Sequence, residues 1–230
     1  MGSSILKKLE KVLRVAESAN VHEAANAAAK AKAIADKYNI IIEILKQRGN
    51  KGYHDEIIDY HETYGKAFRY NLFPWELVLS KVIADHSGCR AFLIWVDGNK
   101  QLNMAGKSTD IEMVDLMFSW LRLQIFSLIL KEEGRSIDWI DAFTLGAIHQ
   151  VNHRMTEAGE ETKKKISSIE GAVAAIVKLD GRLSEVDKFL NSSFFTENVV
   201  QASNPEGFFK GFDAARSIIV EKHLTLKDKE

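Results

Sequence analysis

The sequence predicts an α+β fold that is mostly α-helical, with helices packed on a small antiparallel β-sheet. Apolar residues recur three and four positions apart over long stretches, and only two prolines occur in 230 residues, so helix should dominate. Residues 90–105 differ, because they have the alternation and the turn dipeptide of a β-hairpin. The single cysteine excludes a framework of internal disulfides and is typical of a reducing compartment.

Two helices are expected at the N-terminus. Ile5, Leu9 and Leu13 fall on one helical stripe, and residues 22–38 are rich in alanine, which favours helix and allows close packing. Asn39 is a plausible end of the second helix. We expect residues 1–48 to form an N-terminal helical hairpin domain and residues 53–230 to form an α+β domain, joined by a short linker.

The second domain should open with an extended segment and a helix. Residues 53–64 contain Ile57 and Ile58, which can add a strand to the sheet. Pro74 can stand in the first turn of a helix, and Ser87-Gly88 can end it.

A hairpin should follow, because Asp97-Gly98 tolerates the positive φ angles of a type I′ turn. A two-residue turn pairs Leu93 with Leu102 and Ala91 with Met104 on one face. The residues between them point to the other face, so we expect a sheet covered on one side.

The helix after the hairpin should be the central one. Thr109 and Glu112 have the spacing of a capping box at its start. From Ile111 to Leu130 a narrow polar stripe leaves most of the circumference apolar, which is typical of a helix buried by several neighbours. The charges of Asp115 and Arg122 argue against a membrane span.

The remainder is less regular. Residues 136–155 predict a helix, and the lysines at 163–165 mark a solvated turn or a continuation of it. Residues 172–179 fit either a strand or a buried helix, and residues 183–190 and 208–220 predict helices.

Two patterns resemble known families. Ile5-Leu6-Lys7-Lys8-Leu9, followed by His22-Glu23-Ala24-Ala25-Asn26-Ala27, resembles the DUF2786 domain, a small helical domain of unknown function. The middle of the chain resembles DUF7168, a domain that often follows it, and the stretch from Gly207 to Gly211 looks like that family's ending. The residues that carry this second likeness are Trp75, Leu79, Ile83-Ala84, Gly88-Cys89-Arg90, Ala105-Gly106, Asp110 and Gly146. The resemblance implies a phage, prophage or bacterial protein and brings no catalytic residues or cofactor with it.

A first candidate site is a phosphate site at a helix start. Lys107, Ser108 and Thr109 follow Gly106 as at the end of a phosphate-binding loop, where free backbone N–H groups and the helix dipole attract an anion. The complete loop needs a glycine where this chain has Gln101, and capping alone also explains Thr109.

A second candidate is a basic surface on the first helical hairpin, which could bind nucleic acid. Its main residues are Lys7, Lys11, Arg14 and Lys30, with Lys8, Lys32 and Lys37 nearby. The alternative is an ordinary solvated face, because Glu10, Glu17, Glu23 and Asp36 interleave with them.

A third candidate is a metal pair. His149 and His153 are one helical turn apart and can face one ion. Gln150 stands where a zinc protease has its glutamate, and no third ligand is evident, so packing histidines are the alternative. Cys89 should be a small buried side chain rather than a nucleophile.

Three functions therefore stay open. The first is a non-enzymatic, phage-type binding protein that recognises a phosphate-bearing ligand, either a nucleotide or nucleic acid. The second is an interaction factor that binds a host or phage protein, with self-association left open. The third is a metal-dependent hydrolase that uses His149 and His153. No secretory signal or membrane span is apparent, so we expect a cytoplasmic protein with no membrane partner.

Overall fold

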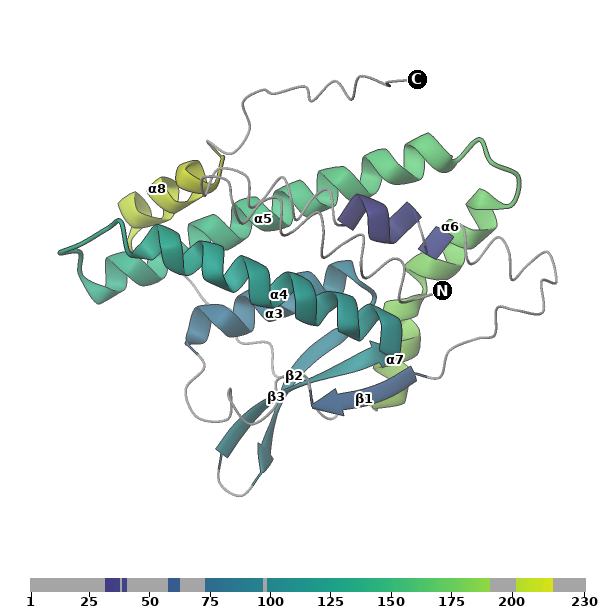
Figure 1. Ribbon diagram of the computed structural model, residues 1–230, viewed down its shortest axis with the longest axis horizontal. Coiled ribbons are helices and arrows are strands. Elements are labelled where there is room, and N and C mark those ends of the chain that lie inside the picture. The colour runs from purple at the N-terminus through teal and green to yellow at the C-terminus, as the bar shows by residue number, and fades with distance from the viewer. Residues whose placement is uncertain are drawn as a thin grey trace, which may run out of the picture.

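The computed structural model of the chain describes residues 32–37, 39–40, 58–62, 73–96, 99–190 and 202–216. Figure 1 shows their elements in chain order: β1 (Ile58–Glu62), α3 (Pro74–His86), β2 (Arg90–Val96), β3 (Asn99–Lys107), α4 (Ser108–Ile129), α5 (Ile137–Ile166), α6 (Ala172–Asp180), α7 (Arg182–Leu190) and α8 (Pro205–Arg216). Residues 32–37 and 39–40, here called the N-terminal helical segment, are also helical. The predicted class, α+β and mostly helical, is confirmed.

Most of the predicted N-terminal hairpin, residues 1–31, lies outside the described residues. Asn39 and Ile40 are helical, and residues 41–57 lie outside the described residues, so the end of the second helix near Asn39 stays a prediction. The Asn39 side chain donates a hydrogen bond to Asp110, as described below.

The three strands form one antiparallel sheet in the order β1-β3-β2. The predicted register is confirmed, because Leu93 pairs with Leu102 and Ala91 with Met104. The turn residues 97–98 lie outside the described residues. The predicted extra strand is β1, which pairs with β3 on the side away from β2.

Both faces of the sheet are covered, so the prediction of a single covered face is wrong. Leu102 and Met104 belong to the main core, which α3, α4 and α5 complete. On the opposite face Phe92 and Ala105 pack with Val186 and Leu190 of α7 in a second cluster. The alternation in the hairpin therefore separates two apolar layers rather than a core face from a wet face.

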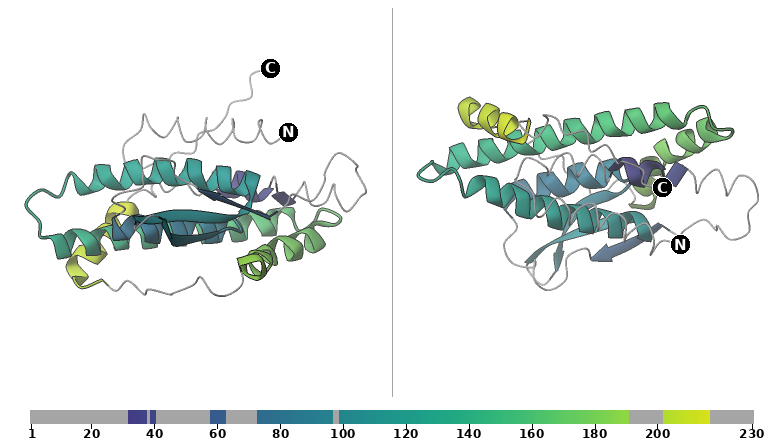
Figure 2. Two further views of the ribbon diagram at one scale, coloured as in Figure 1. Left: turned by 90° about the horizontal axis from the view of Figure 1, so that it is seen from below. Right: turned by 45° about the horizontal axis from the view of Figure 1, so that its top comes forward.

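Helix α4 is central, as predicted. Met117, Phe118 and Leu121 are buried in the main core, and Glu112 and Ser119 are exposed along its polar stripe. Helix α3 contacts both α4 and α5, and Figure 2 shows these three helices running side by side. No helix among the described residues is long and apolar enough to cross a membrane.

The predicted capping box of α4 is wrong. The helix begins at Ser108, and its N-cap is Lys107, whose side chain makes no capping hydrogen bond. Strand β3 runs directly into the helix, so the cap position falls on the last strand residue. Thr109 is therefore already inside the first turn, and Glu112 is exposed.

Every regular element that the structure describes in the C-terminal third is a helix. Helix α5 continues through the lysines at 163–165, and α6 resolves residues 172–179 in favour of helix. Helix α8 crosses α5 so closely that a Cβ added at Gly211 would meet the Phe143 carbonyl group. At Gly146 an added Cβ would lie 2.8 Å from the Phe212 nitrogen, so glycine is needed at both positions.

Candidate functional site

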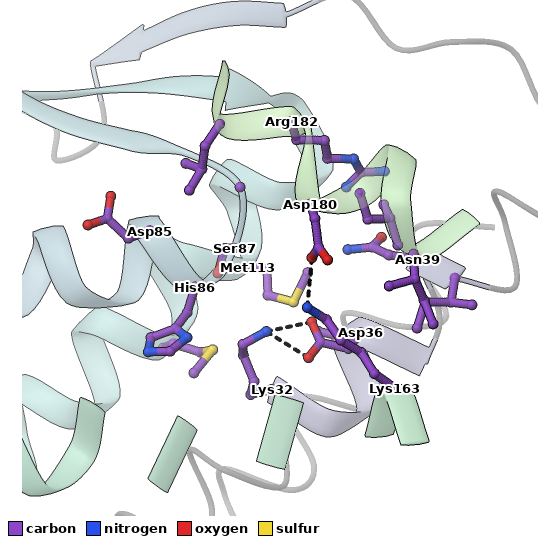
Figure 3. A pocket seen from close by; sticks show the side chains of 17 residues that line it. Lys32, Asp36, Asn39, Asp85, His86, Ser87, Met113, Lys163, Asp180 and Arg182 are labelled. Carbon is purple, nitrogen blue, oxygen red and sulfur yellow. Dashed lines mark hydrogen bonds and ion pairs between the residues drawn. The ribbon is translucent and has the colours of Figure 1, made fainter. Parts of the chain in front are cut away.

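A cavity of about 200 Å³ lies where the N-terminal helical segment meets α4, α5, α6, α7 and the end of α3. Its charged lining consists of three cationic side chains and three carboxylates: Lys32, Lys163 and Arg182 with Asp36, Asp85 and Asp180. Figure 3 shows most of these groups gathered on one side of the cavity, with His86 and Asp85 on the other.

Two ion pairs stand next to each other in this lining (Figure 3). The Lys32 Nζ donates to both carboxylate oxygens of Asp36, at 2.6 and 2.7 Å, and both side chains are largely buried. The Lys163 Nζ donates to Asp180 Oδ1 at 2.7 Å, in a position about half-exposed. A Cβ added at Gly159 of α5 would lie 3.4 Å from Asp36 Oδ2, at ordinary van der Waals distance, so the first pair lies next to this part of the helix.

A buried network lies behind the cavity. Arg182 Nη1 donates to Asp110 Oδ2 at 2.8 Å, and Asn39 Nδ2 donates to Asp110 Oδ1 at 3.3 Å. These contacts join α7, the first turn of α4 and the N-terminal helical segment. Nearby, burial first and the Asp110 charge second raise the pKa of the Cys89 thiol. Cys89 is therefore a buried, protonated side chain, as predicted.

His86 contributes a neutral ring to the other side of the cavity. Its Nε2 lies 2.7 Å from Asn152 Oδ1, so Nε2–H donates to that oxygen. Burial lowers the pKa of His86, outweighing the hydrogen bond to Asn152, which raises it. The ring is therefore uncharged near pH 7.

The cations keep hydrogen-bonding capacity for a ligand. An ammonium group has three N–H donors and a guanidinium has five. Within the described part of the chain, Lys163 uses one of its hydrogens for Asp180, and Arg182 uses one nitrogen for Asp110. Oxygen atoms of a ligand in the cavity can accept from the donors that remain.

The rest of the lining is aliphatic or thioether. It comprises Ala35, Ile40, Met113, Met117, Ile176, Leu179 and Leu183. No Phe, Tyr or Trp is among the described lining residues. The cavity thus offers cations and apolar walls, without a ring on which a nucleic-acid base could stack.

The predicted phosphate-loop residues are not in this lining. Lys107 is buried at the junction of β3 and α4, and Ser108 and Thr109 lie half-buried in the first turn. Gly106 packs against Cys89, whose sulfur would meet a Cβ added at that position. Close packing therefore explains the glycine at position 106. Ligand binding by Lys107, Ser108 or Thr109 stays a prediction.

Of the predicted basic surface, Lys7, Lys11, Arg14 and Lys30 lie outside the described residues. Lys32, which the sequence places beside them, is buried in the ion pair with Asp36 rather than spread on a solvated face.

The predicted metal pair has other neighbours. The His149 ring lies 5.9 Å from the Phe208 ring and 5.8 Å from the Phe212 ring, between centroids. His153 Nδ1 lies 3.5 Å from Glu157 Oε2. In the described ranges no three His, Cys, Asp or Glu side chains are grouped as a metal site requires. Hydrolysis at this pair stays a prediction.

Sequence reasoning did not select the later cavity residues Lys163, Asp180 and Arg182 as site residues. Lys163 belongs to a run of three lysines, which is typical of solvated helix ends. Asp180 and Arg182 flank Gly181 between two apolar segments. This charged interruption is the sequence feature that could have indicated site residues here.

Residues 4–40 match a family model. Its description is Protein of unknown function (DUF2786), and the match confirms the resemblance of the N-terminal pattern. The matched range includes Lys32, Asp36 and Asn39, the residues that bring the N-terminal helical segment into the site. No curated protein and no solved structure matches the chain.

Proposed function

We propose that this chain is a non-enzymatic binding protein for a phosphate-bearing ligand, and that the cavity at the end of the DUF2786 segment holds the phosphate. The observation that carries the proposal is the convergence of Lys163, Arg182 and Lys32 from separate segments on one cavity. Two of these cations retain N–H donors beyond their described ion pairs. Charge-assisted hydrogen bonds from such donors are the usual means of holding phosphate.

The wider setting belongs to the same proposal. The likeness of the middle of the chain to DUF7168 supports a phage-type or bacterial protein, and the predicted cytoplasmic location would give access to nucleotides and nucleic acid. The basic residues Lys7, Lys11, Arg14 and Lys30 would then extend the binding surface for a longer phosphate-bearing partner.

Isothermal titration calorimetry tests the proposal with inorganic phosphate, AMP and a short single-stranded oligonucleotide. We expect at least one of these probes to bind, and Lys163→Gln to weaken it by about tenfold or more, as for one lost charge-assisted hydrogen bond. Lys165→Gln is the matched control, because Lys165 lies on the same helix in an exposed pair with Glu161 at 3.0 Å, outside the cavity. Equal effects of the two variants, or no binding of any probe, would exclude the cavity as a phosphate site.

A second candidate function, binding of a host or phage protein, is favoured by α6. Ile169, just before the helix, and Val173 and Val177 within it recur every four residues and are 45–67% exposed. Exposed apolar stripes of this kind often mark protein contacts. A Val173→Asp/Val177→Asp variant with an unchanged circular dichroism spectrum should lose any protein captured by the wild type. Retention of that protein by the variant would argue against this surface.

A further inference from the structure

We infer that the ligand of the cavity is a compact aminoalkyl phosphate, a molecule with one phosphate monoester and one ammonium group a few bonds apart. The inference rests on the proposed phosphate-binding function and narrows the ligand class from nucleotides to small zwitterions. Three observations support this ligand class: the charge balance of the lining, an ion pair that the ligand can replace, and the size of the cavity.

The charged groups of the lining are already matched in ion pairs. Lys32 pairs with Asp36, Lys163 pairs with Asp180, and Arg182 pairs with Asp110. The remaining lining carboxylate, Asp85, is paired with Arg90 at 2.7 Å. His86 adds no positive charge near pH 7, because burial lowers its pKa. A phosphate dianion alone would bring uncompensated negative charge into this partly enclosed site, which is unfavourable. An ammonium group on the same molecule offsets part of that charge.

The pair between Lys163 and Asp180 offers a place for each end of such a ligand. It is the more exposed of the two cavity pairs, and so the less costly one to open. Phosphate oxygens can accept from Lys163 and from the remaining donors of Arg182, while the ligand ammonium donates to Asp180. Every charge released when the internal pair opens is then paired again.

The size and walls of the cavity favour a small aliphatic molecule over a nucleotide. A volume of about 200 Å³ is below the roughly 300–1,000 Å³ of sites that enclose drug-sized ligands. The described lining provides no aromatic ring for a base, whereas Met113, Met117 and Ile176 provide an apolar wall for a methylene linker. O-phosphoethanolamine is therefore the probe that matches the site.

Calorimetry of the full chain at pH 7.5 compares O-phosphoethanolamine with glycerol 3-phosphate, inorganic phosphate and AMP. Glycerol 3-phosphate is similar in size and carries hydroxyl groups in place of the ammonium group. We expect O-phosphoethanolamine to bind about tenfold more tightly than glycerol 3-phosphate, as for one added charge-assisted hydrogen bond.

Two variants test the phosphate contact and the ammonium contact separately. Lys163→Gln should weaken both phosphate esters about equally. Asp180→Asn should abolish the preference for the amine while leaving inorganic phosphate bound as well as before or better, because it removes a negative charge that competes for Lys163. Both positions are partly exposed, so the fold should tolerate these changes. Glu161→Gln and Lys165→Gln, in the exposed pair on the same helix, are the matched controls and should change neither affinity.

The outcomes distinguish this inference from the proposed function. One contrary result is equal affinity for O-phosphoethanolamine and glycerol 3-phosphate, and another is tighter binding of AMP. If Lys163→Gln also weakens binding, either result would contradict a zwitterionic ligand and still support the phosphate site. Failure of all four compounds to bind would overturn the inference, and failure of the oligonucleotide as well would overturn the proposed function. A tenfold amine preference that Asp180→Asn abolishes would establish the inference.

Discussion

Replacing Arg182 with methionine should destabilise the fold more than any exposed charge substitution. The Arg182 and Asp110 side chains are 9% and 1% exposed, and their closest atoms are 2.8 Å apart. Methionine keeps the apolar stem of arginine and removes the guanidinium group. Asp110 then keeps its contact with Asn39 at 3.3 Å but loses the ion pair with Arg182.

The magnitude follows from burial. At 2.8 Å the attraction between two unit charges is about 6 kcal/mol for an effective dielectric constant of about 20. Desolvation of both groups offsets much of this gain, so removing one partner of a buried pair typically costs about 3–5 kcal/mol. Such a loss is a large fraction of the roughly 5–15 kcal/mol by which a folded protein is stable. By contrast, Lys165 and Glu161 are 74% and 68% exposed at 3.0 Å, and exposed pairs contribute about 0–1 kcal/mol.

Urea unfolding followed by tryptophan fluorescence measures this loss. With a slope of about 2–3 kcal/mol per molar urea, Arg182→Met should lower the midpoint by about 1–2.5 M, and the control Lys165→Met by less than about 0.5 M. Arg182→Met/Asp110→Asn should recover part of the loss, because the buried carboxylate charge is removed together with its ion-pair partner. A single-variant loss below about 1 kcal/mol at an unchanged slope, or a double variant no better than the single one, would refute the reasoning.

Three further predictions concern close packing and pH. Gly211→Ala should lower the free energy of unfolding by about 1–3 kcal/mol, because the added Cβ meets a carbonyl group of α5. Gly181→Ala, whose added Cβ lies at least 3.4 Å from its neighbours, should change it by less than about 1 kcal/mol, and equal losses in urea titrations would contradict this. Gly106→Ala should lower the free energy of unfolding by a similar amount, about 1–3 kcal/mol, because the added Cβ contacts the Cys89 sulfur. Adding Cys89→Ala should restore part of this free energy. Purely additive effects in the double variant would show that the sulfur is not the cause. Burial lowers the pKa of His86 in the folded state, so below its unfolded pKa of about 6.5 the unfolded chain binds more protons, and stability falls as pH drops from 7 towards the folded pKa. His86→Gln should flatten this fall between pH 7.5 and pH 5.5, and an unchanged slope would assign it to other groups.

The parts of the fold that follow from local pattern were predictable. The register that pairs Leu93 with Leu102 is set by alternation and by the length of a tight turn, both contained in a few consecutive residues. The burial of α4 follows in the same way from one helical period.

The misses occurred where distant segments decide the outcome. Phe92 and Ala105 look like the outer face of a hairpin until Val186 and Leu190 of α7 cover them. Residues 172–179 are too short an apolar run for periodicity to distinguish strand from helix, so their neighbours settle it. The cap of α4 shifted because β3 leads into it without a loop.

The candidate site was harder to predict, because it joins residues that are far apart in the sequence. Arg182 is 72 positions from Asp110, and Asn39 is 71 positions from it on the other side. Each of these residues alone reads as an ordinary polar residue at a helix end. Their function as a network depends on the fold that brings them together, which composition and spacing do not encode.

The same distances bear on how the chain divides. The sequence predicts a boundary near residues 48–52, yet the cavity takes Lys32 and Asp36 from before it and Lys163 and Arg182 from after it. The hydrogen bond from Asn39 to Asp110 links residues from before and after this predicted boundary directly behind the cavity. A ligand that occupies the cavity therefore binds the DUF2786 segment and the following helices at once. Ligand binding should accordingly stabilise the docking of the N-terminal helical segment on α5, where the Lys32–Asp36 pair lies next to Gly159.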